Sequence, residues 1–178
     1  MEYTIIRSRR KSISIEITPR GEILVRTPLR LSKRDIQRFV ESRQDWIANH
    51  LSKIPAVTSL TANEHKALIL AAKETLPFKA AFYAKQLDVT FGRITIRSQH
   101  TRWGSCSASG NLSFNCLLML APEEVQNYVV VHELCHRKQM NHSPAFWAEV
   151  ETILPDYRQQ KAWLKEHGAS LLARLPLP

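Results

Sequence analysis

The N-terminal sequence alternates apolar and polar residues with the period of half-buried β-strands. Residues 3–7, 12–17 and 22–26 each follow this alternation, which places the apolar side chains of a strand on one face. A Pro-Arg-Gly sequence at 19–21 separates the last two stretches, and proline and glycine favour a tight turn. We therefore expect three short strands that form a β-hairpin or a meander.

Apolar residues then recur at helical spacing. Ser32 and Asp35 have the spacing of a helix-capping pair, and the helical pattern continues to Leu51, so one helix is expected to run from Ser32 and to stop before Pro55. Residues 56–60 are interpreted as a linker. The sequence thus predicts a basic N-terminal domain at 1–60 and a second domain at 61–178, or one continuous domain over 1–178.

The second part of the chain mixes helices with strands. Thr61 and Glu64 again have capping spacing and begin a helix that runs toward Leu87. A strand is expected at 93–97 and a hairpin or curled strand pair within 101–120. Further helices are predicted to begin at three prolines: Pro122, from which the helix continues to about Gln139, then Pro144 and Pro155. The expected fold class is α+β, with a small mixed sheet.

Length and composition exclude several classes of protein. With 178 residues, 44% of them hydrophobic, the chain can bury a core. It has no apolar run of about 18 residues for a membrane span and no secretion signal at its start, so a cytoplasmic location without membrane contact is expected. Cys106, Cys116 and Cys135 are not at CxxC spacing, which excludes a four-thiolate zinc site and a disulfide framework.

The charge is concentrated near the N-terminus. Lys and Arg number 25 against 16 Asp and Glu, and the first 60 residues hold 12 basic and 6 acidic residues. Such an excess attracts nucleic acid or acidic partners. Weak, nonspecific binding of nucleic acid is therefore one interpretation of the basic residues Arg7, Arg9, Arg10 and Lys11, although a solvated hairpin explains them more simply.

The helix after Pro122 contains the sequence His132-Glu133-Leu134-Cys135-His136, an HExxH motif. Residues four apart lie on one face of a helix, so both imidazoles point the same way and are prepositioned as metal ligands. Glu133 lies beside them and can reach a metal-bound water, while Leu134 points into the core. Two histidines and a carboxylate on an apolar helix cost free energy unless they are paired or bound to metal.

A catalytic zinc site takes three protein ligands and keeps one position for water. His142, ten residues after His132, is the leading third ligand, because Asn141 can end the helix in left-handed geometry and Ser143 can begin the next one. The alternative is a carboxylate from that next helix, Glu149 or Glu151.

Several stretches of the chain resemble the YgjP-like family of metallopeptidases. The stretches that carry the resemblance are Arg102-Trp103-Gly104-Ser105-Cys106, Gly110-Asn111-Leu112, Asn115, the segment from Tyr128 to His136, Asn141-His142-Ser143-Pro144-Ala145-Phe146-Trp147, and Trp163-Leu164-Lys165. The resemblance implies a zincin-like fold, a relationship to WLM and SprT-like zinc proteases associated with DNA–protein crosslink repair, His132, His136 and His142 as zinc ligands, and Glu133 as catalytic acid/base. The chain departs from the family pattern at Cys116, Asn127 and Arg137, none of which belongs to the implied metal set.

The expected activity is hydrolysis of peptide bonds with one Zn²⁺ per chain. Zinc would activate a water, and Glu133 would take its proton and return it to the leaving amine. The donor to the oxyanion stays open among Tyr128, Asn115 and Arg102, and the strand at 111–116 is expected to offer its edge to an extended peptide. The alternative function is a basic nucleic-acid-binding or adaptor protein with a structural zinc site.

Overall fold

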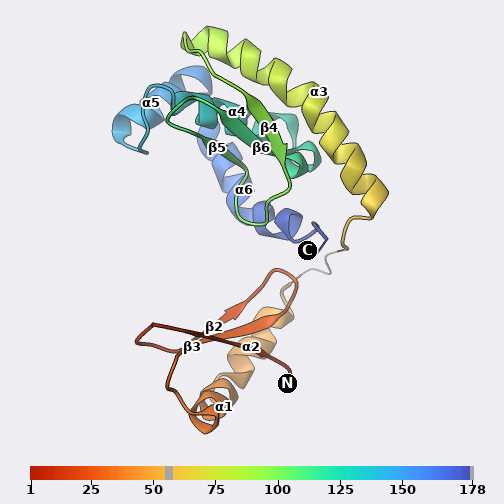
Figure 1. Cartoon of the computed structure of the whole chain (residues 1–178), viewed down its shortest axis with the longest axis vertical. Coiled ribbons are helices and arrows are strands. Elements are labelled where there is room, and N and C mark those ends of the chain that lie inside the picture. Colours follow the sequence, from red (N-terminus) through yellow and green to blue (C-terminus); the bar gives the residue numbers. More distant parts are fainter. Residues whose placement is uncertain (55–57, 177–178) are drawn as a thin grey trace. The chain divides into compact units, whose positions relative to one another are not determined.

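The computed structural model describes residues 1–54 and 58–176, and the chain divides into two compact units, Met1–Thr58 and Ser59–Pro178 (Figure 1). The predicted linker at 56–60 lies partly outside the described residues. Across the described residues, no helix combines the length and apolar character needed to cross a membrane.

The first unit contains a three-stranded sheet. Its strands are β1 (Thr4–Ser8), β2 (Ser14–Ile17) and β3 (Ile23–Pro28), in the order β1-β3-β2. The predicted hairpin is present, because β2 and β3 pair in antiparallel fashion around a turn in which Gly21 has a φ of 81°. β1 joins the other edge of β3 in parallel, so the strand order is not that of a meander.

Two helices, α1 (Lys33–Glu41) and α2 (Gln44–Leu51), cover one face of this sheet (Figure 1). The single helix predicted from Ser32 is wrong, because the helix breaks between the two. The Ser42 hydroxyl donates a hydrogen bond of 2.7 Å to the Phe39 carbonyl, and Arg43 leaves helical geometry at a φ of −116°. Serine competes in this way for backbone groups that a continuous helix would use. The core of the unit consists of Ile23, Val25, Ile36, Val40 and Ile47.

The second unit begins with the long helix α3 (Ala62–Leu87). Thr61 and Glu64 form a complete capping box at its start, as their spacing predicted. The helix continues through Pro77, where the sequence suggests a kink, and ends at Asp88, whose φ is 53°. One face of the helix is buried, and its buried residues recur every three or four positions: Ala72, Leu76, Ala80, Ala84 and Leu87.

A second three-stranded sheet lies between helices (Figure 1). Its strands are β4 (Ile94–Arg97), β5 (Gly104–Cys106) and β6 (Leu112–Asn115), in the order β4-β6-β5. β6 pairs in parallel with β4 and antiparallel with β5, so the sheet is mixed, as predicted. Since β6 is the central strand, both its edges are occupied, and the expected substrate edge at 111–116 is wrong. In the described structure, β4 and β5 are the two strands of this sheet that each have one unpaired edge.

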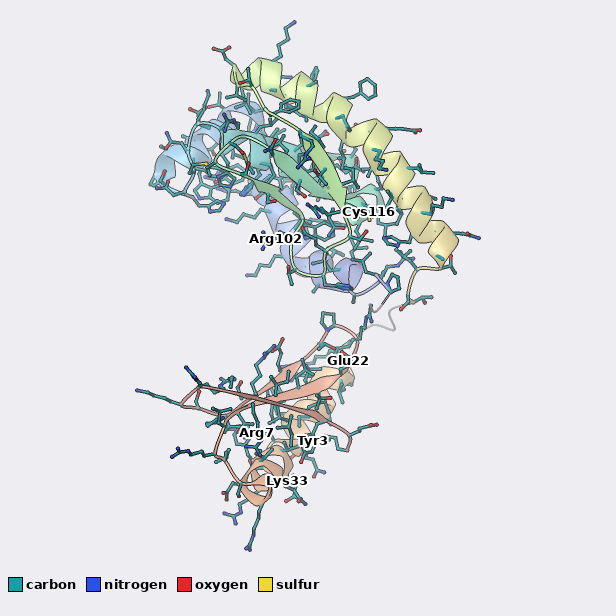
Figure 2. The ribbon with its side chains drawn as sticks, in the orientation of Figure 1. Tyr3, Arg7, Glu22, Lys33, Arg102 and Cys116 are labelled. Atoms are coloured by element: carbon teal, nitrogen blue, oxygen red, sulfur yellow. The ribbon has the colours of Figure 1, made fainter. Side chains whose placement is uncertain are left out.

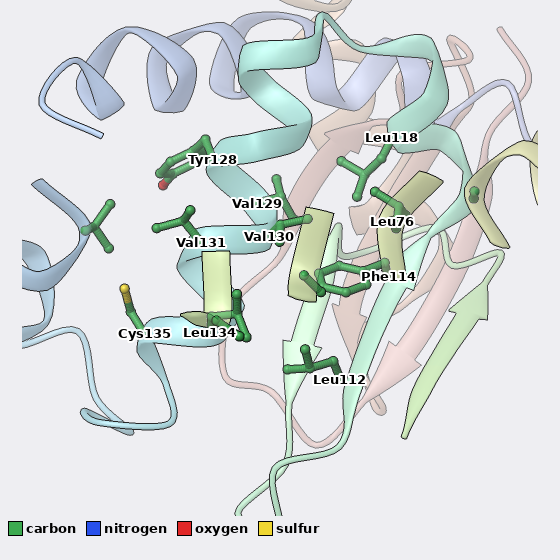
Figure 3. Close-up of a cluster of buried hydrophobic side chains, with 14 of the residues drawn as sticks. Leu76, Leu112, Phe114, Leu118, Tyr128, Val129, Val130, Val131, Leu134 and Cys135 are labelled. Atoms are coloured by element: carbon green, nitrogen blue, oxygen red, sulfur yellow. The ribbon is translucent and has the colours of Figure 1, made fainter. Parts of the chain in front are cut away.

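A 3₁₀ turn, η1 (Cys116–Leu120), leads from the sheet into the helices α4 (Glu123–Cys135), α5 (Pro144–Ile153) and α6 (Tyr157–Leu172). α4 is shorter than the predicted helix to about Gln139, because it ends at Cys135 and His136 is its C-cap. Its side chains, with Leu76 of α3 and Leu112 and Phe114 of β6, fill the core of the unit (Figure 3).

Candidate metal centre

The buried helix α4 fixes the position of the HExxH motif. Val130, Val131 and Leu134 have no exposed surface and pack into the core (Figure 3). Burial of these three side chains fixes the rotation of α4 about its own axis. His132 and His136 lie on the opposite face of the helix and therefore point away from the core. The packing of the apolar residues around the motif therefore fixes the orientation of its polar residues.

Three imidazoles meet beside α4. His132, His136 and His142 can place one nitrogen each so that all three atoms lie within 4.8 Å of one another, and the Nε2 atoms of His132 and His142 are 2.9 Å apart. His142 reaches this point from the turn between α4 and α5. Asn141 does not use the left-handed geometry expected of it, since Asp88 is the one described non-glycine residue with a positive φ.

The end of α4 sets the tautomer of His136. The backbone N–H groups of Arg137, Lys138 and Gln139 donate to the carbonyls of Leu134 and Cys135, which curls the chain just after the helix. This turn brings the Gln139 carbonyl to 3.0 Å from Nδ1 of His136. A ring nitrogen next to a carbonyl must carry the proton, so Nε2 of His136 keeps its lone pair for a ligand.

An aromatic wall surrounds His132. The ring centroids of Phe146, Tyr128 and Trp147 lie 4.9, 5.8 and 5.8 Å from that of the histidine. In the described part of the chain, the buried Nδ1 of His132 has no hydrogen-bond partner. Burial, with the nearby His136 and His142, lowers the pKa of His132 to about 3, and burial lowers the pKa of His142 as well. Both rings are therefore neutral at physiological pH.

Glu133 is buried, with 6% of its surface exposed. Burial raises the pKa of its carboxyl to about 8, and the positive charge of Arg102 opposes this rise. Gly104 of β5 packs directly on the carboxyl group, since a Cβ atom at this position would lie 2.6 Å from Oε1 of Glu133. Glu133 and the histidines share a cavity of about 290 Å³, lined by Gly104, Ser105, Cys106, His132, Glu133, His136, Met140 and His142.

The competing carboxylates point elsewhere. Glu149 forms an ion pair of 3.0 Å with Lys138, and Glu151 pairs with Arg158. Neither residue belongs to the histidine cluster found among the described residues.

Of the three residues considered for oxyanion binding, Asn115 is engaged with backbone groups, whereas Tyr128 and Arg102 act on residues of the HExxH motif. The Asn115 amide donates to the carbonyls of Gln99 and Arg102, and its oxygen accepts from the N–H of Leu117, so this side chain holds the loop before β5. Tyr128 lies against His132. Arg102, labelled in Figure 2, is exposed and acts on Glu133 through its charge.

Sequence reasoning missed the roles of two residues. Nothing in the spacing of Gly104 shows that it touches Glu133, although it stands within a stretch that carried the family resemblance. Arg137, a departure from the family pattern, ties the end of α4 to two segments. Its Nε donates to the Thr90 carbonyl, between α3 and β4, at 2.9 Å, and one terminal nitrogen donates to the Ala108 carbonyl, in the β5–β6 turn, at 3.4 Å.

The tryptophans Trp103 and Trp147 differ in their surroundings. Trp103 packs against the core and against Gly168. Trp147 also packs there, and its ring stacks on that of His142, with 5.7 Å between the centroids and 28° between the ring planes.

Comparison with known proteins assigns the chain to a protein family. A family model described as the YgjP-like metallopeptidase domain matches residues 11–69 and 57–167, which together span most of the chain. No curated protein matches the chain. Among solved structures, the metallopeptidase zymogen of Pyrococcus abyssi abylysin is 21% identical, covers 52% of this chain and 94% of its own, and gives a TM-score of 0.47. The metallopeptidase zymogen of Methanocaldococcus jannaschii jannalysin is 19% identical, with 52% and 96% covered and a TM-score of 0.47. On the match of the family model, the chain belongs to the YgjP-like metallopeptidases.

Proposed function

We propose that this metallopeptidase holds one zinc ion per chain through His132, His136 and His142 and cleaves peptide bonds with Glu133 as general acid/base. The observation that carries this proposal is the convergence of three imidazole nitrogens within 4.8 Å beside a buried carboxyl group. Isolated buried histidines and glutamates cost free energy, whereas a metal ion bound among them offsets that cost.

The donor set fits zinc. Neutral imidazoles suit zinc, while magnesium and calcium select oxygen ligands. The lowered pKa values of His132 and His142 keep these rings neutral, and the contact of His136 with the Gln139 carbonyl orients its ring. Three protein ligands leave the fourth tetrahedral position for water or substrate, which is the composition of a catalytic rather than a structural site.

Glu133 is the residue that moves the proton. Zinc bound at the three histidines would acidify a water molecule and polarise the scissile carbonyl. Glu133 takes a proton from the attacking water on a carboxylate oxygen and gives it to the leaving amine nitrogen as the C–N bond breaks. In the metal-free protein burial raises the pKa of Glu133, and the charge of a bound zinc ion would favour the carboxylate form that accepts the proton.

β5 is the element that aligns the substrate. Its one strand neighbour in the described structure is β6, and its residues Gly104, Ser105 and Cys106 line the cavity that holds the histidines. An extended peptide can add to such an edge through main-chain hydrogen bonds, which would hold a peptide bond next to Glu133. Tyr128 and Arg102 are the remaining oxyanion donors.

Metal analysis of two matched variants tests the ligand set. We expect the wild type to contain about one zinc per chain, and His142→Ala to lose several kcal/mol of zinc affinity, because one of three ligands is removed. Glu149→Ala changes a residue on the neighbouring helix and should keep full zinc occupancy. Full retention of zinc in His142→Ala together with loss in Glu149→Ala would move the third ligand to α5.

The alternative, a basic nucleic-acid-binding or adaptor protein with a structural zinc, uses the same histidines. It gives no purpose to Glu133, which is buried next to them at a cost. The two functions therefore differ in their prediction for Glu133→Gln. The variant should lose peptide cleavage if the protein is a peptidase, and should show no change if the zinc site is purely structural.

A further inference from the structure

A groove in the first unit lies apart from the metal centre. It runs between β2 and the two helices, has a volume of about 260 Å³, and is lined by Ile13, Ser14, Ile15, Phe39, Arg43 and Trp46. The proposed peptidase mechanism uses none of these residues.

One wall of the groove is an open strand edge. β2 pairs with β3 through Ser14–Ile17, and in the described structure no strand lies on its other side. In an antiparallel pair, the N–H and C=O groups of alternate residues point away from the partner strand. These unpaired groups are a ready template for another extended segment.

The opposite wall combines aromatic surface with a cation. Trp46 is 41% exposed, which is unusual for so large an apolar side chain. The break between α1 and α2 places Arg43 at the groove, with its guanidinium carbon 5.9 Å from the centre of the Phe39 ring. Within residues 1–54 and 58–176, no carboxylate forms an ion pair with Arg43.

The charge around the groove indicates an acidic occupant. Arg9, Arg10 and Lys11 stand just before Ile13 in the sequence, and they too are absent from the ion pairs of the described residues. A second groove beside the other edge strand, β1, has no such character, because it is lined by Met1, Tyr3, Gln37, Val40, Glu41 and Gln44, with a glutamate and no basic side chain.

We propose that this groove binds an extended, acidic segment of another protein, which adds to β2 as a further strand. An apolar side chain of that segment packs between Ile15 and Trp46, and a carboxylate two residues along, on the same face of the strand, pairs with Arg43. A strand edge favours a peptide over nucleic acid, because main-chain N–H and C=O groups match it and a sugar-phosphate chain has no such alternation.

The test uses the full chain and four labelled probes. They are a short peptide of the repeat Leu-Ser-Glu-Ser, which puts leucine and glutamate on one face of the strand, the same peptide with lysine for glutamate, the glutamate peptide N-methylated at alternate residues, and a thymidine oligonucleotide. Binding is followed by fluorescence anisotropy, and the site is mapped by NMR shifts of backbone amides. The protein variants are Arg43→Glu and, as a matched charge reversal outside the groove, Lys33→Glu at the start of α1 (Figure 2).

We expect the glutamate peptide to bind, to shift amides of β2 and of the α1–α2 junction, and to lose about tenfold or more in affinity with Arg43→Glu but under about twofold with Lys33→Glu. N-methylation should abolish binding, because it removes main-chain donors. Equal losses in the two variants, equal binding of the lysine or N-methylated peptide, or shifts of these amides by the oligonucleotide alone would each overturn the proposal. Circular dichroism of both variants excludes unfolding as the cause of a loss.

Discussion

At the residue scale, Gly104 determines how closely β5 approaches the carboxyl group of Glu133. Gly104→Ala would put a Cβ atom 2.6 Å from Oε1 and 2.7 Å from Cγ of Glu133, so the carboxyl group must move. Because a misplacement of about 1 Å can cost on the order of a hundredfold in rate, we expect kcat to fall about tenfold or more at unchanged zinc content. Ser105→Ala, at the next position of β5, is the control. An unchanged kcat in Gly104→Ala would show that Glu133 needs no fixed position.

Glu133 also predicts how the stability of the metal-free protein depends on pH. Burial raises its pKa from 4.5 to about 8, so the folded state binds the proton more tightly than the unfolded state. The contribution of Glu133 to stability is fully present below about pH 4.5 and is lost as pH rises toward 8. Glu133→Gln has no such loss and should exceed the wild type in stability above neutral pH, by several kcal/mol at most.

This pH dependence is measured by urea unfolding of both proteins in chelator at several pH values. The lowered pKa of His132 makes the protein gain stability as pH rises from about 3 to 6.5. Because His132 is present in both proteins, its contribution cancels in the comparison. A stability difference that stays constant from pH 5 to about 8 would contradict the burial of an ionisable Glu133.

Sequence spacing predicted that the three histidines come together, but not the contacts that surround them. His132, Glu133 and His136 followed from the helical period, and His142 from its place after the helix. The contact between Gly104 and Glu133 could not be predicted, because it joins residues far apart in the sequence through the packing of a strand on a helix. The same holds for Arg137, whose hydrogen-bond partners lie 47 and 29 residues away.

At the element scale, periodicity predicted which segments are strands and helices but not their order or breaks. The polar–apolar alternation of β6 shows that the segment is a strand. It carries no information on its neighbours, and β6 is central where an edge was expected. The break between α1 and α2 depends on one hydrogen bond from Ser42, which the apolar pattern around it does not reveal.

The β5–β6 hairpin should depend on Arg137. Arg137→Ala removes one hydrogen bond to the Ala108 carbonyl in the hairpin turn and one to the Thr90 carbonyl before β4. Such bonds from a guanidinium are each worth about 1.5–3 kcal/mol when well shielded, and this partly buried site should lose at the low end of that range. We expect kcat/KM to fall several-fold with zinc retained, since β5 would be less well held. Hydrogen exchange of the hairpin amides should become faster.

Lys138→Ala is the matched control, because it removes the adjacent cation, which pairs with Glu149 rather than with the hairpin. If both variants change kcat/KM equally, Arg137 acts through general charge and not through the hairpin.

At the scale of the whole molecule, the two units carry different properties. The first holds most of the excess positive charge, and the second holds the cluster of three histidines that could bind a metal ion. Charge alone does not identify a partner, so weak binding of nucleic acid stays a prediction, as does the cytoplasmic location. The family match covers parts of both units, which places the basic unit within the same family pattern as the peptidase motif.

The most direct test of the central claim, that this chain is a zinc peptidase using Glu133, is to measure zinc content and peptide cleavage together in the wild type and in Glu133→Gln. The amide is similar in size to the carboxylate but cannot accept the proton. We predict equal zinc content and normal folding in both proteins, with cleavage lowered by about a hundredfold or more in the variant. Cleavage at comparable rates by the two proteins, at equal zinc content, would contradict the claim and favour a structural zinc.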